Sequence, residues 1–244
     1  MAPTKVQSNA KKRSNLETWL DRETPHKQAA LENASRHFAK KDDLTVNTLE
    51  ALYGQESSFG KTRGKRGSAG AAGDFQLKKE TARRLGLIVT EKNDERFDVD
   101  SASAAAAKLL RINDGIFSKK TVLTKDINST PVADPAERKK FALAAFNAGE
   151  GRIAKAQKLA EKAGLNPTKW DNVKKYLREA GANEGQAREA EDYVEKVLDY
   201  ESQFASKSQA DKAVKTGPPR KVKKLEERGH WITLEGRHIF VEDK

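Results

Sequence analysis

One glutamate occupies a position in which a carboxylate could act as a general acid. Val46, Leu49, Leu52 and Tyr53 recur at helical spacing, and Glu56 takes the next position on that apolar face. Burial at the edge of a core disfavours the charged form of a carboxylate and raises its pKa. A raised pKa suits a group that must deliver a proton near neutral pH. The sequence therefore makes Glu56 the first candidate for a catalytic residue.

A glycine-rich stretch follows Glu56 and could bring the backbone close to a ligand, because glycine has no Cβ. Its glycines are Gly60, Gly64, Gly67, Gly70 and Gly73. Gln76 closes the stretch with an amide that can both donate and accept hydrogen bonds. By itself, the pattern favours a solvated surface glutamate followed by ordinary turns, since short motifs also match by chance.

Four short motifs resemble those of the soluble lytic transglycosylases, which are lysozyme-like enzymes that cut the glycan of peptidoglycan. The motifs are Glu56-Ser57, Gly70 to Gln76, Ala144 to Gly149, and Glu191 to Leu198. They follow the order of the family, with similar gaps, over about residues 29–204. The resemblance implies an all-α, lysozyme-like domain of the goose-type/SLT kind, and it implies the activity of a lytic transglycosylase.

The resemblance also implies a mechanism with a single carboxylate. Glu56 would act first as the acid on the glycosidic oxygen between MurNAc and GlcNAc, and then as a base. The N-acetyl group of the substrate would supply the nucleophile, and the 6-hydroxyl would close a 1,6-anhydro-MurNAc ring without water. Most glycosidases use two carboxylates instead. A muramidase of the same fold, which consumes water, is the alternative.

By resemblance, a further set of residues would contact the glycan near the cleavage point: Ser57, Gly73, Asp74, Phe75, Gln76, Asn147 and Tyr193. Two positions depart from the family pattern. Phe146 replaces the usual tyrosine, so it is assigned to packing only. Asp74 replaces an apolar residue and could hold a water that favours hydrolysis. We instead expect it to cap a helix that begins near Phe75, because aspartate is a preferred N-cap residue.

The composition excludes several kinds of site. The chain of 244 residues has no cysteine, which rules out disulfides and Cys-ligated metals. The four histidines (His26, His37, His230 and His238) do not have the spacing of a metal site. The glycines do not have the spacing of a phosphate-binding loop. No apolar run has the length of a membrane span, and residues 1–13 lack the apolar core of a signal peptide. We therefore expect no metal, no cofactor, no membrane span and no signal peptide.

Helical periodicity predicts the elements that must position these residues. The expected helices cover about 28–39, 46–56, 75–85, 100–116, 135–147, 153–163, 173–180 and 187–198, with a loop over 119–133. The expected domains are a basic, loosely ordered segment (1–28, with a short helix near 15–22), a lysozyme-like domain (29–204), a Lys-rich linker (205–229) and a β-hairpin tail (230–244).

The linker prediction rests on Gly217-Pro218-Pro219, because consecutive prolines favour an extended chain. The hairpin prediction rests on period-two alternation around a two-residue turn at Glu235-Gly236. That turn would pair Trp231 with Phe240, Ile232 with Ile239, and Thr233 with His238. A lone hairpin is marginal in water, so we expect it to dock on the core or on a partner.

The net charge of +11 lies mainly in the flanks, with +4 in residues 1–42 and +5 in residues 205–228. Basic flanks suit an anionic partner, although such runs are often only solvated. The tail weakly resembles the endings of phage structural and lysis proteins. We therefore expect a phage protein, kept in the virion or the host cytoplasm, that reaches the periplasm or cell wall by injection or at lysis.

The expected partners are peptidoglycan glycan strands. Through the flanks and the hairpin, we also expect binding to an anionic cell-wall polymer or to other virion proteins. The alternative from another class is a non-catalytic virion protein, with a structural or nucleic-acid-binding role.

Overall fold

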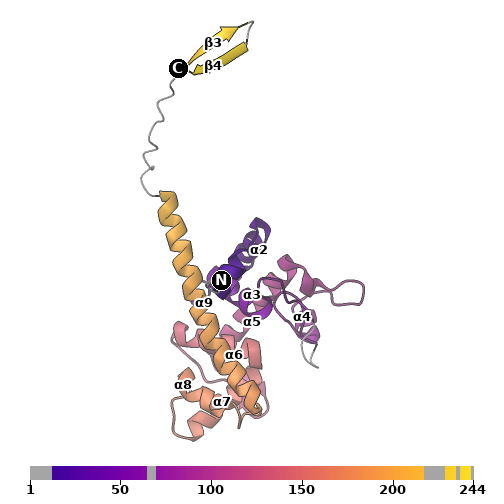
Figure 1. Ribbon diagram of the computed structural model, residues 1–244. Coiled ribbons are helices and arrows are strands. Elements are labelled where there is room, and N and C mark those ends of the chain that lie inside the picture. Colours follow the sequence, from indigo (N-terminus) through magenta and orange to yellow (C-terminus); the bar gives the residue numbers. More distant parts are fainter. Residues whose placement is uncertain (1–12, 65–69, 217–228, 235–236, 243–244) are drawn as a thin grey trace, which may run out of the picture. The chain divides into compact units, whose positions relative to one another are not determined.

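The computed structural model describes residues 13–64, 70–216, 229–234 and 237–242, with side chains described as far as Asp211 (Figure 1). The chain divides into two compact units, residues 1–206 and 207–244. The predicted helical character of the chain is confirmed in the described residues, where strands are few and short.

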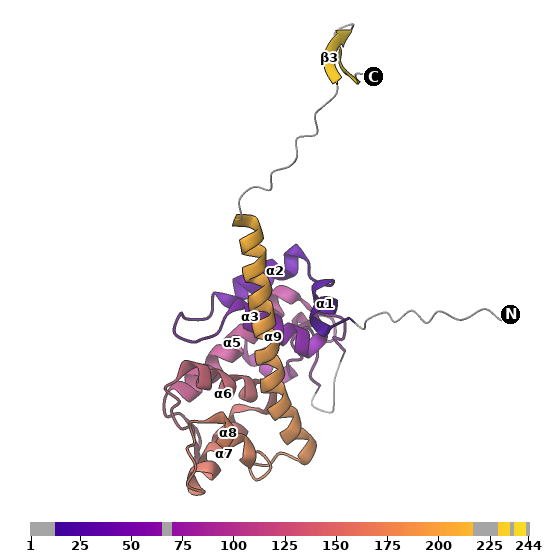
Figure 2. The same ribbon diagram turned by 60° about the vertical axis from the view of Figure 1, so that its left-hand side comes forward.

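The helices are α1 (Asn15–Leu20), α2 (Pro25–Ser35), α3 (Val46–Ser57), α4 (Lys79–Arg84), α5 (Val99–Ser118), α6 (Pro135–Ala148), α7 (Glu150–Lys162), α8 (Trp170–Val173) and α9 (Glu184–Thr216). Two 3-10 turns, η1 (Glu95–Phe97) and η2 (Lys174–Tyr176), join them. Helix α5 packs against α2, α3 and α6, and α6 packs against α7 and α8. Figure 2 shows α5 and α6 within the helical unit and α9 passing along it.

Aromatic side chains form the core beneath the end of α3. Tyr53 stacks on Phe75 with ring centroids 5.3 Å apart, and Phe59 packs against Tyr53, Trp19 and Phe204. All five side chains are buried. Full burial of one large apolar side chain contributes about 1.5–3 kcal/mol. This cluster therefore fixes the last turn of α3, which carries Glu56.

A buried glutamate holds α9 against α3 and α6. Thr48 Oγ1 donates a hydrogen bond of 2.5 Å to Glu201 Oε1, and Lys139 Nζ lies 3.1 Å from Glu201 Oε2. Glu201 is only 9% exposed. A buried carboxylate is tolerated when it is paired and hydrogen-bonded. The three helices that carry the candidate site residues are thus joined by one carboxylate.

Residues 13–28 are more ordered than the sequence suggests. Ser14 and Glu17 form a capping box at the start of α1, and Trp19 is only 4% exposed. The reciprocal cap satisfies two backbone donors that would otherwise stay open, and the tryptophan adds apolar burial. The expected loose order therefore fails for these residues, while residues 1–12 lie outside the described part of the chain.

The prediction of a loop over residues 119–133 is wrong in its middle. Strands β1 (Val122–Thr124) and β2 (Ile127–Asn128) pair antiparallel, with Val122 opposite Asn128. Three of these residues are β-branched, and such side chains favour extended backbone. The strands are too short for period-two alternation to reveal them in the sequence.

Helix α9 continues to Thr216, so the linker expected from residue 205 begins as helix. Residues 205–216 contain neither glycine nor proline, and the helix stops where Gly217-Pro218 follows. The rest of the expected linker lies outside the described residues.

In the second unit, β3 (Gly229–Leu234) pairs antiparallel with β4 (Arg237–Glu242). The partners include Trp231 with Phe240, Ile232 with Ile239, and Thr233 with His238, which are the pairs that the alternation predicts. The turn at residues 235–236 is outside the described residues, and the docking of the hairpin stays a prediction.

Candidate active site

Glu56 lies in the last turn of α3 and is half-buried. The helix ends directly after it, because Ser58 and Phe59 both adopt left-handed backbone angles, with φ of 52° and 58°. Tyr193 of α9 donates a hydrogen bond of 2.5 Å from its Oη to Glu56 Oε1. The partial burial that the sequence predicts for Glu56 is confirmed, and one carboxylate oxygen is held in place by the tyrosine.

Tyr193 is suited to remain a donor. Burial raises the pKa of its phenol well above the ordinary value, and the neighbouring charge and hydrogen bond of Glu56 raise it further. The side chain is only 4% exposed. The phenol therefore keeps its proton near neutral pH and remains the donor to the glutamate.

Two cavities meet at Glu56. The first has a volume of about 300 Å³ and is lined by α3 and α9, with Gln55, Asp192 and Tyr193 on its walls. The second has a volume of about 460 Å³ and extends towards α4 and α6. Both cavities are lined by Glu56, Asn147 and Glu189. We call the two together the cleft. A chain-like ligand could pass from one to the other beside the glutamate.

Asn147 lies in the last turn of α6, and its Nδ2 donates to Glu189 Oε1 at 3.5 Å. An ionised carboxylate can only accept hydrogen bonds, so it selects the orientation of the amide. The amide oxygen of Asn147 is then the atom offered to a ligand. The sequence placed Asn147 in the site, and the structure brings it to both cavities.

Gln76 lines the second cavity and carries two signs of a functional residue. Its backbone is left-handed with φ of 47°, which is uncommon for a residue other than glycine. Its Nε2 donates to the carbonyl of Gly73 at 2.8 Å, whereas its buried Oε1 has no hydrogen-bond partner among the described residues. Residues with strained backbone angles and buried acceptors without a partner are both found more often at functional sites than elsewhere.

Four of the predicted glycan contacts line neither cavity: Ser57, Gly73, Asp74 and Phe75. Ser57 is fully buried, and its hydroxyl bonds the backbone of Tyr53 and Gly60. Gly73 has a φ of 83° and lies against the carbonyl of Arg96. In the structure Gly73, Asp74 and Phe75 form the turn that carries Gln76, whereas Ser57 ties the end of α3 to the chain that follows it.

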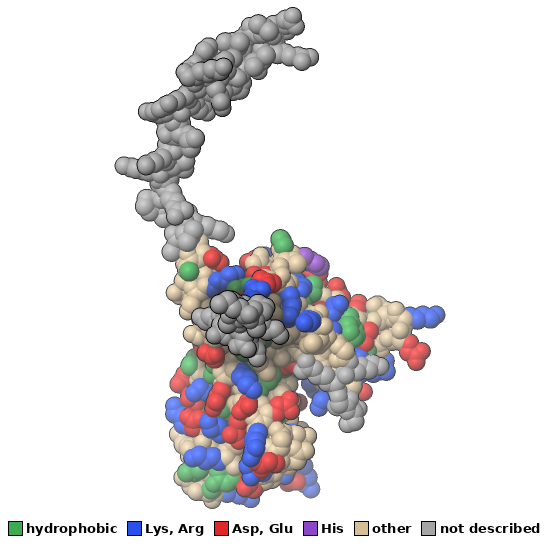
Figure 3. Space-filling view, viewed as in Figure 1, with side chains coloured by type: hydrophobic (Ala, Val, Ile, Leu, Met, Phe, Trp, Pro, Cys, Tyr) green, Lys and Arg blue, Asp and Glu red, His purple; other side chains and the backbone are tan. Residues whose placement is uncertain are grey.

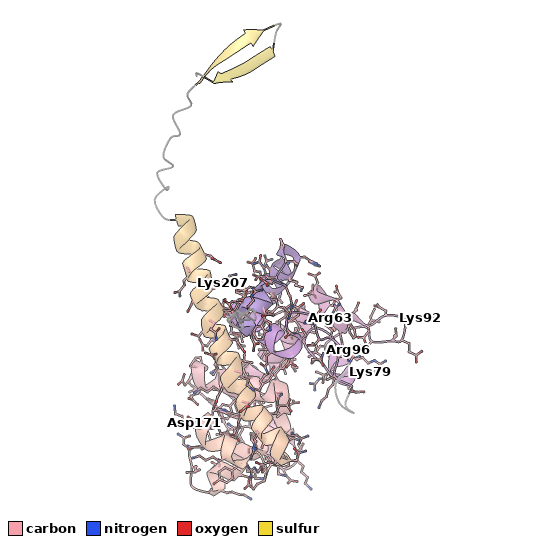
Figure 4. All side chains as sticks on the ribbon, viewed as in Figure 1. Arg63, Lys79, Lys92, Arg96, Asp171 and Lys207 are labelled. Carbon is pink, nitrogen blue, oxygen red and sulfur yellow. The ribbon has the colours of Figure 1, made fainter. Side chains whose placement is uncertain are left out.

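The prediction that Asp74 caps a helix is wrong. Helix α4 begins only at Lys79, with Lys78 at its N-cap. Asp74 is instead fully buried: its Oδ1 accepts from Tyr53 Oη at 3.3 Å, and its Oδ2 lies 3.8 Å from Arg63 Nη1. Figure 4 shows Arg63 on the side of the unit that also carries Arg96. Since Asp74 lies outside both cavities, its position does not favour the water-holding alternative.

Asp74→Asn is expected to keep or raise the melting temperature at neutral pH. Burial raises the pKa of Asp74, against the opposing effects of Arg63 and Tyr53. A raised folded-state pKa means that stability is greatest when the group is protonated, and that it declines as the pH rises through the folded pKa. Wild type should therefore gain stability relative to the variant on acidification, as measured by thermal unfolding between about pH 4 and 7.5.

Asp171→Asn provides the control of opposite sign. The hydrogen bond from Lys174 lowers the pKa of this exposed aspartate, so its small contribution to stability is present at neutral pH and declines on acidification. A loss of stability in Asp74→Asn at neutral pH that disappeared in acid would contradict the assignment for Asp74.

Glu189 was missed by sequence reasoning. It lies on α9 four residues before Tyr193, and residues at that spacing share one face of a helix. This spacing could have identified it once Tyr193 was placed in the site. Arg84 and Glu150 were missed as well. They line the second cavity and form a loose pair, with Arg84 Nη1 3.9 Å from Glu150 Oε1.

The acidic residues of the cleft do not belong to a large surface patch of one charge. On the face shown in Figure 3, the acidic and basic side chains of the described residues are interspersed. The first cavity carries Glu56, Glu189 and Asp192 against Lys196. Within the described residues, no group of three or more His, Cys, Asp or Glu side chains could hold a metal ion. No helix in that part of the chain is long and apolar enough to span a membrane.

Tyr193→Phe is expected to lower the rate of any reaction that depends on Glu56 by about 10-fold to 100-fold, because hydrogen bonds to charged groups contribute about 1.5–3 kcal/mol. The ring stays, so the melting temperature should change little. Tyr200→Phe on the same helix is the matched control, since it removes only the hydrogen bond from Asn15. Equal activity of Tyr193→Phe and wild type would show that the tyrosine does not orient the acid.

Comparison with known proteins gives one family and a set of relatives. The transglycosylase SLT domain matches residues 33–167, which is more than half of the chain. A membrane-bound lytic murein transglycosylase F from Pseudomonas fluorescens is 33% identical over 155 residues, covering 62% of this chain and 28% of that protein. Proteins of the same name from Shewanella woodyi and Desulfosudis oleivorans are 30% and 32% identical, covering 65% and 62% of this chain and 31% of each relative. The chain thus spans less than a third of the length of these relatives.

Proposed function

The chain belongs to the transglycosylase SLT domain family, and from this premise we propose that it is a lytic transglycosylase of peptidoglycan. Its reaction is cleavage of the β-1,4 bond between MurNAc and GlcNAc with formation of 1,6-anhydro-MurNAc. The observation that carries the proposal is the half-buried Glu56, held by Tyr193 where two cavities meet. Glu56, Gln76 and Asn147 lie within the region that the family matches, and Tyr193 lies after it.

In the proposed reaction, Glu56 starts as a carboxylic acid and gives its proton to the oxygen of the glycosidic bond. The bond to C1 breaks as the N-acetyl oxygen of the same sugar forms a bond to C1. Glu56, now a carboxylate, then takes the proton of the 6-hydroxyl as that oxygen attacks C1 and releases the N-acetyl group. The acid is thereby restored, and no water is consumed. Such acid and base steps each contribute about 10²–10⁴-fold.

Gln76 and Asn147 are proposed to position the sugar beside Glu56. Gln76 lines the second cavity, so its side chain can contact the glycan there. The amide oxygen of Asn147, which lines both cavities, can accept a hydrogen bond from the glycan, since Glu189 accepts one from the amide nitrogen. Holding the reacting groups in place is itself a large part of catalysis.

A muramidase of the same fold is the second candidate, and Glu189 is the observation that favours it. This carboxylate lines both cavities together with Glu56. Hydrolases that use two carboxylates need one of them to act on a water. In this alternative Glu56 remains the acid and Glu189 acts on the water.

Mass spectrometry of the muropeptides released by the purified full chain separates the candidates. Products with anhydro ends, lighter by one water than reducing ends, support the transglycosylase. Reducing ends support the muramidase. No released product from intact walls would favour the non-catalytic alternative.

We propose further that the chain is phage-encoded and reaches the periplasm or cell wall by virion injection or at lysis, with the basic flanks and the hairpin binding an anionic wall polymer or other virion proteins. The weak resemblance of the tail and the charge of the flanks support this. Detection of the chain in purified virions would support it as well. Its presence only in the envelope of uninfected cells would contradict it.

A further inference from the structure

A further pocket lies beside the cleft and shares Arg84 with it. It has a volume of about 410 Å³, and its walls come from the chain after α2, from α4 and from α5. We call it the side pocket. Its lining residues are His37, Arg84, Leu85, Lys108, Arg111 and Ile112. Because Arg84 also lines the second cavity, a ligand in the cleft could extend a branch into the side pocket.

Three of the four polar side chains that line the side pocket are cationic, and the fourth is His37. Arg84, Lys108 and Arg111 are all exposed, and none of the six described residues that line the pocket is acidic. Within the described residues, neither Lys108 nor Arg111 forms an ion pair. Each therefore has donors available to an anionic ligand, which charge-assisted hydrogen bonds would hold.

One wall of the side pocket is apolar, and another is held in place by a hydrogen bond between two segments. Leu85 is 9% exposed, whereas Ile112 is 46% exposed and is one of the few large apolar side chains that face solvent. Arg111 Nη1 donates to the carbonyl of His37 at 2.6 Å, which ties α5 to the chain after α2. Arginine carries five N–H donors, so the others stay free while the side chain is held at the wall.

We propose that the side pocket binds the carboxylates of the peptide stem attached to the glycan strand in the cleft. This inference rests on the proposed function, since it assumes that the strand in the cleft is peptidoglycan. The sugars of a glycan strand offer mostly hydroxyl and amide groups. The stem instead offers several carboxylates on short aliphatic side chains, which match the cations and the apolar wall. A branch of the same substrate also fits the position of Arg84, which lines both the side pocket and the second cavity.

The test compares two forms of one substrate: soluble glycan strands that carry stems, and the same strands stripped of stems with an amidase. Binding is measured with the full chain carrying Glu56→Gln, so that the strands stay intact. The stem-bearing strands should bind about tenfold or more tightly than the stripped strands, since hydrogen bonds to charged groups are among the strong ones.

Lys108→Glu in that background reverses one charge of the side pocket. The residue is exposed and unpaired among the described residues, so folding is not at risk. We expect the variant to lose most of the preference for stem-bearing strands and to bind stripped strands as before. Lys92→Glu is the matched control, because Lys92 is exposed and Figure 4 shows it on an outlying loop away from the helices.

The outcomes distinguish a failure of the stem site from a failure of the proposed function. Equal binding of both strand forms, or an equal loss for both in Lys108→Glu, would overturn the stem site while leaving the proposed function intact. A chain with intact Glu56 that released no product from either form would overturn the proposed function, and the binding preference would still report on the pocket. A preference that Lys92→Glu reduced as much as Lys108→Glu would mean that general surface charge is responsible.

Discussion

Glu56→Gln is expected to lower the rate of glycan cleavage by at least about 10²–10⁴-fold, the range typical of general acid–base catalysis. Glutamine keeps the shape of glutamate and can still accept the hydrogen bond of Tyr193, but it cannot deliver a proton. Because the packing around the last turn of α3 is unchanged, we expect the melting temperature to hold or to rise slightly, since a partly desolvated charge is removed.

The decisive measurement is the rate of wall lysis and the melting temperature of one Glu56→Gln preparation. Glu161→Gln is the matched control, since it removes an exposed helical carboxylate of α7 that lines neither cavity. A folded Glu56→Gln protein that kept more than about a tenth of the wild-type rate would rule out Glu56 as the essential proton donor.

Gly73→Ala is expected to reduce both stability and activity. A Cβ at this position would lie within 1.9 Å of the carbonyl oxygen of Arg96, and its φ of 83° is a conformation that disfavours side chains. Residues other than glycine in such backbone regions cost about 1–3 kcal/mol. The clash with rigid backbone adds to this cost, so the melting temperature should drop by roughly 5 °C or more for a chain of this size.

The loss of activity in Gly73→Ala comes from Gln76, whose amide donates to the Gly73 carbonyl at 2.8 Å. If the turn shifts, the amide shifts with it, and a misplacement of about 1 Å can cost about 10²-fold in rate. Gly164→Ala is the control: its φ is 76°, but its Cβ would meet no atom within 4 Å. Equal melting temperatures for the two variants, measured by thermal unfolding, would show that the contact with Arg96 is not restrictive.

The candidate acid could be predicted from sequence because Glu56 lies on a regular helix. Its apolar neighbours recur at helical spacing, so the half-burial seen in the structure follows from the pattern. Most of the other helices could be predicted in the same way, because their apolar residues recur at helical spacing over several turns. Asn147, Gln76 and Tyr193 came from motif resemblance, and the structure brings all three to the cleft.

Other features depend on contacts between distant segments, which a single sequence does not reveal. Asp74 follows a glycine and precedes an apolar residue, as an N-cap can. Its actual environment is instead set by Tyr53 and Arg63, which reach it from α3 and from the loop that follows. The side pocket is likewise formed by three segments, and no local pattern marks it.

The hydrogen bond between Tyr193 and Glu56 joins residues that are 137 positions apart. A ribosome makes and releases α3 long before α9, because domains emerge from their N-terminal side during synthesis. A nascent or prematurely ended chain would therefore carry the acid without the phenol that orients it and without the α9 wall of the first cavity. The geometry of the candidate site is therefore complete only once α9 has been synthesised and Tyr193 has reached Glu56.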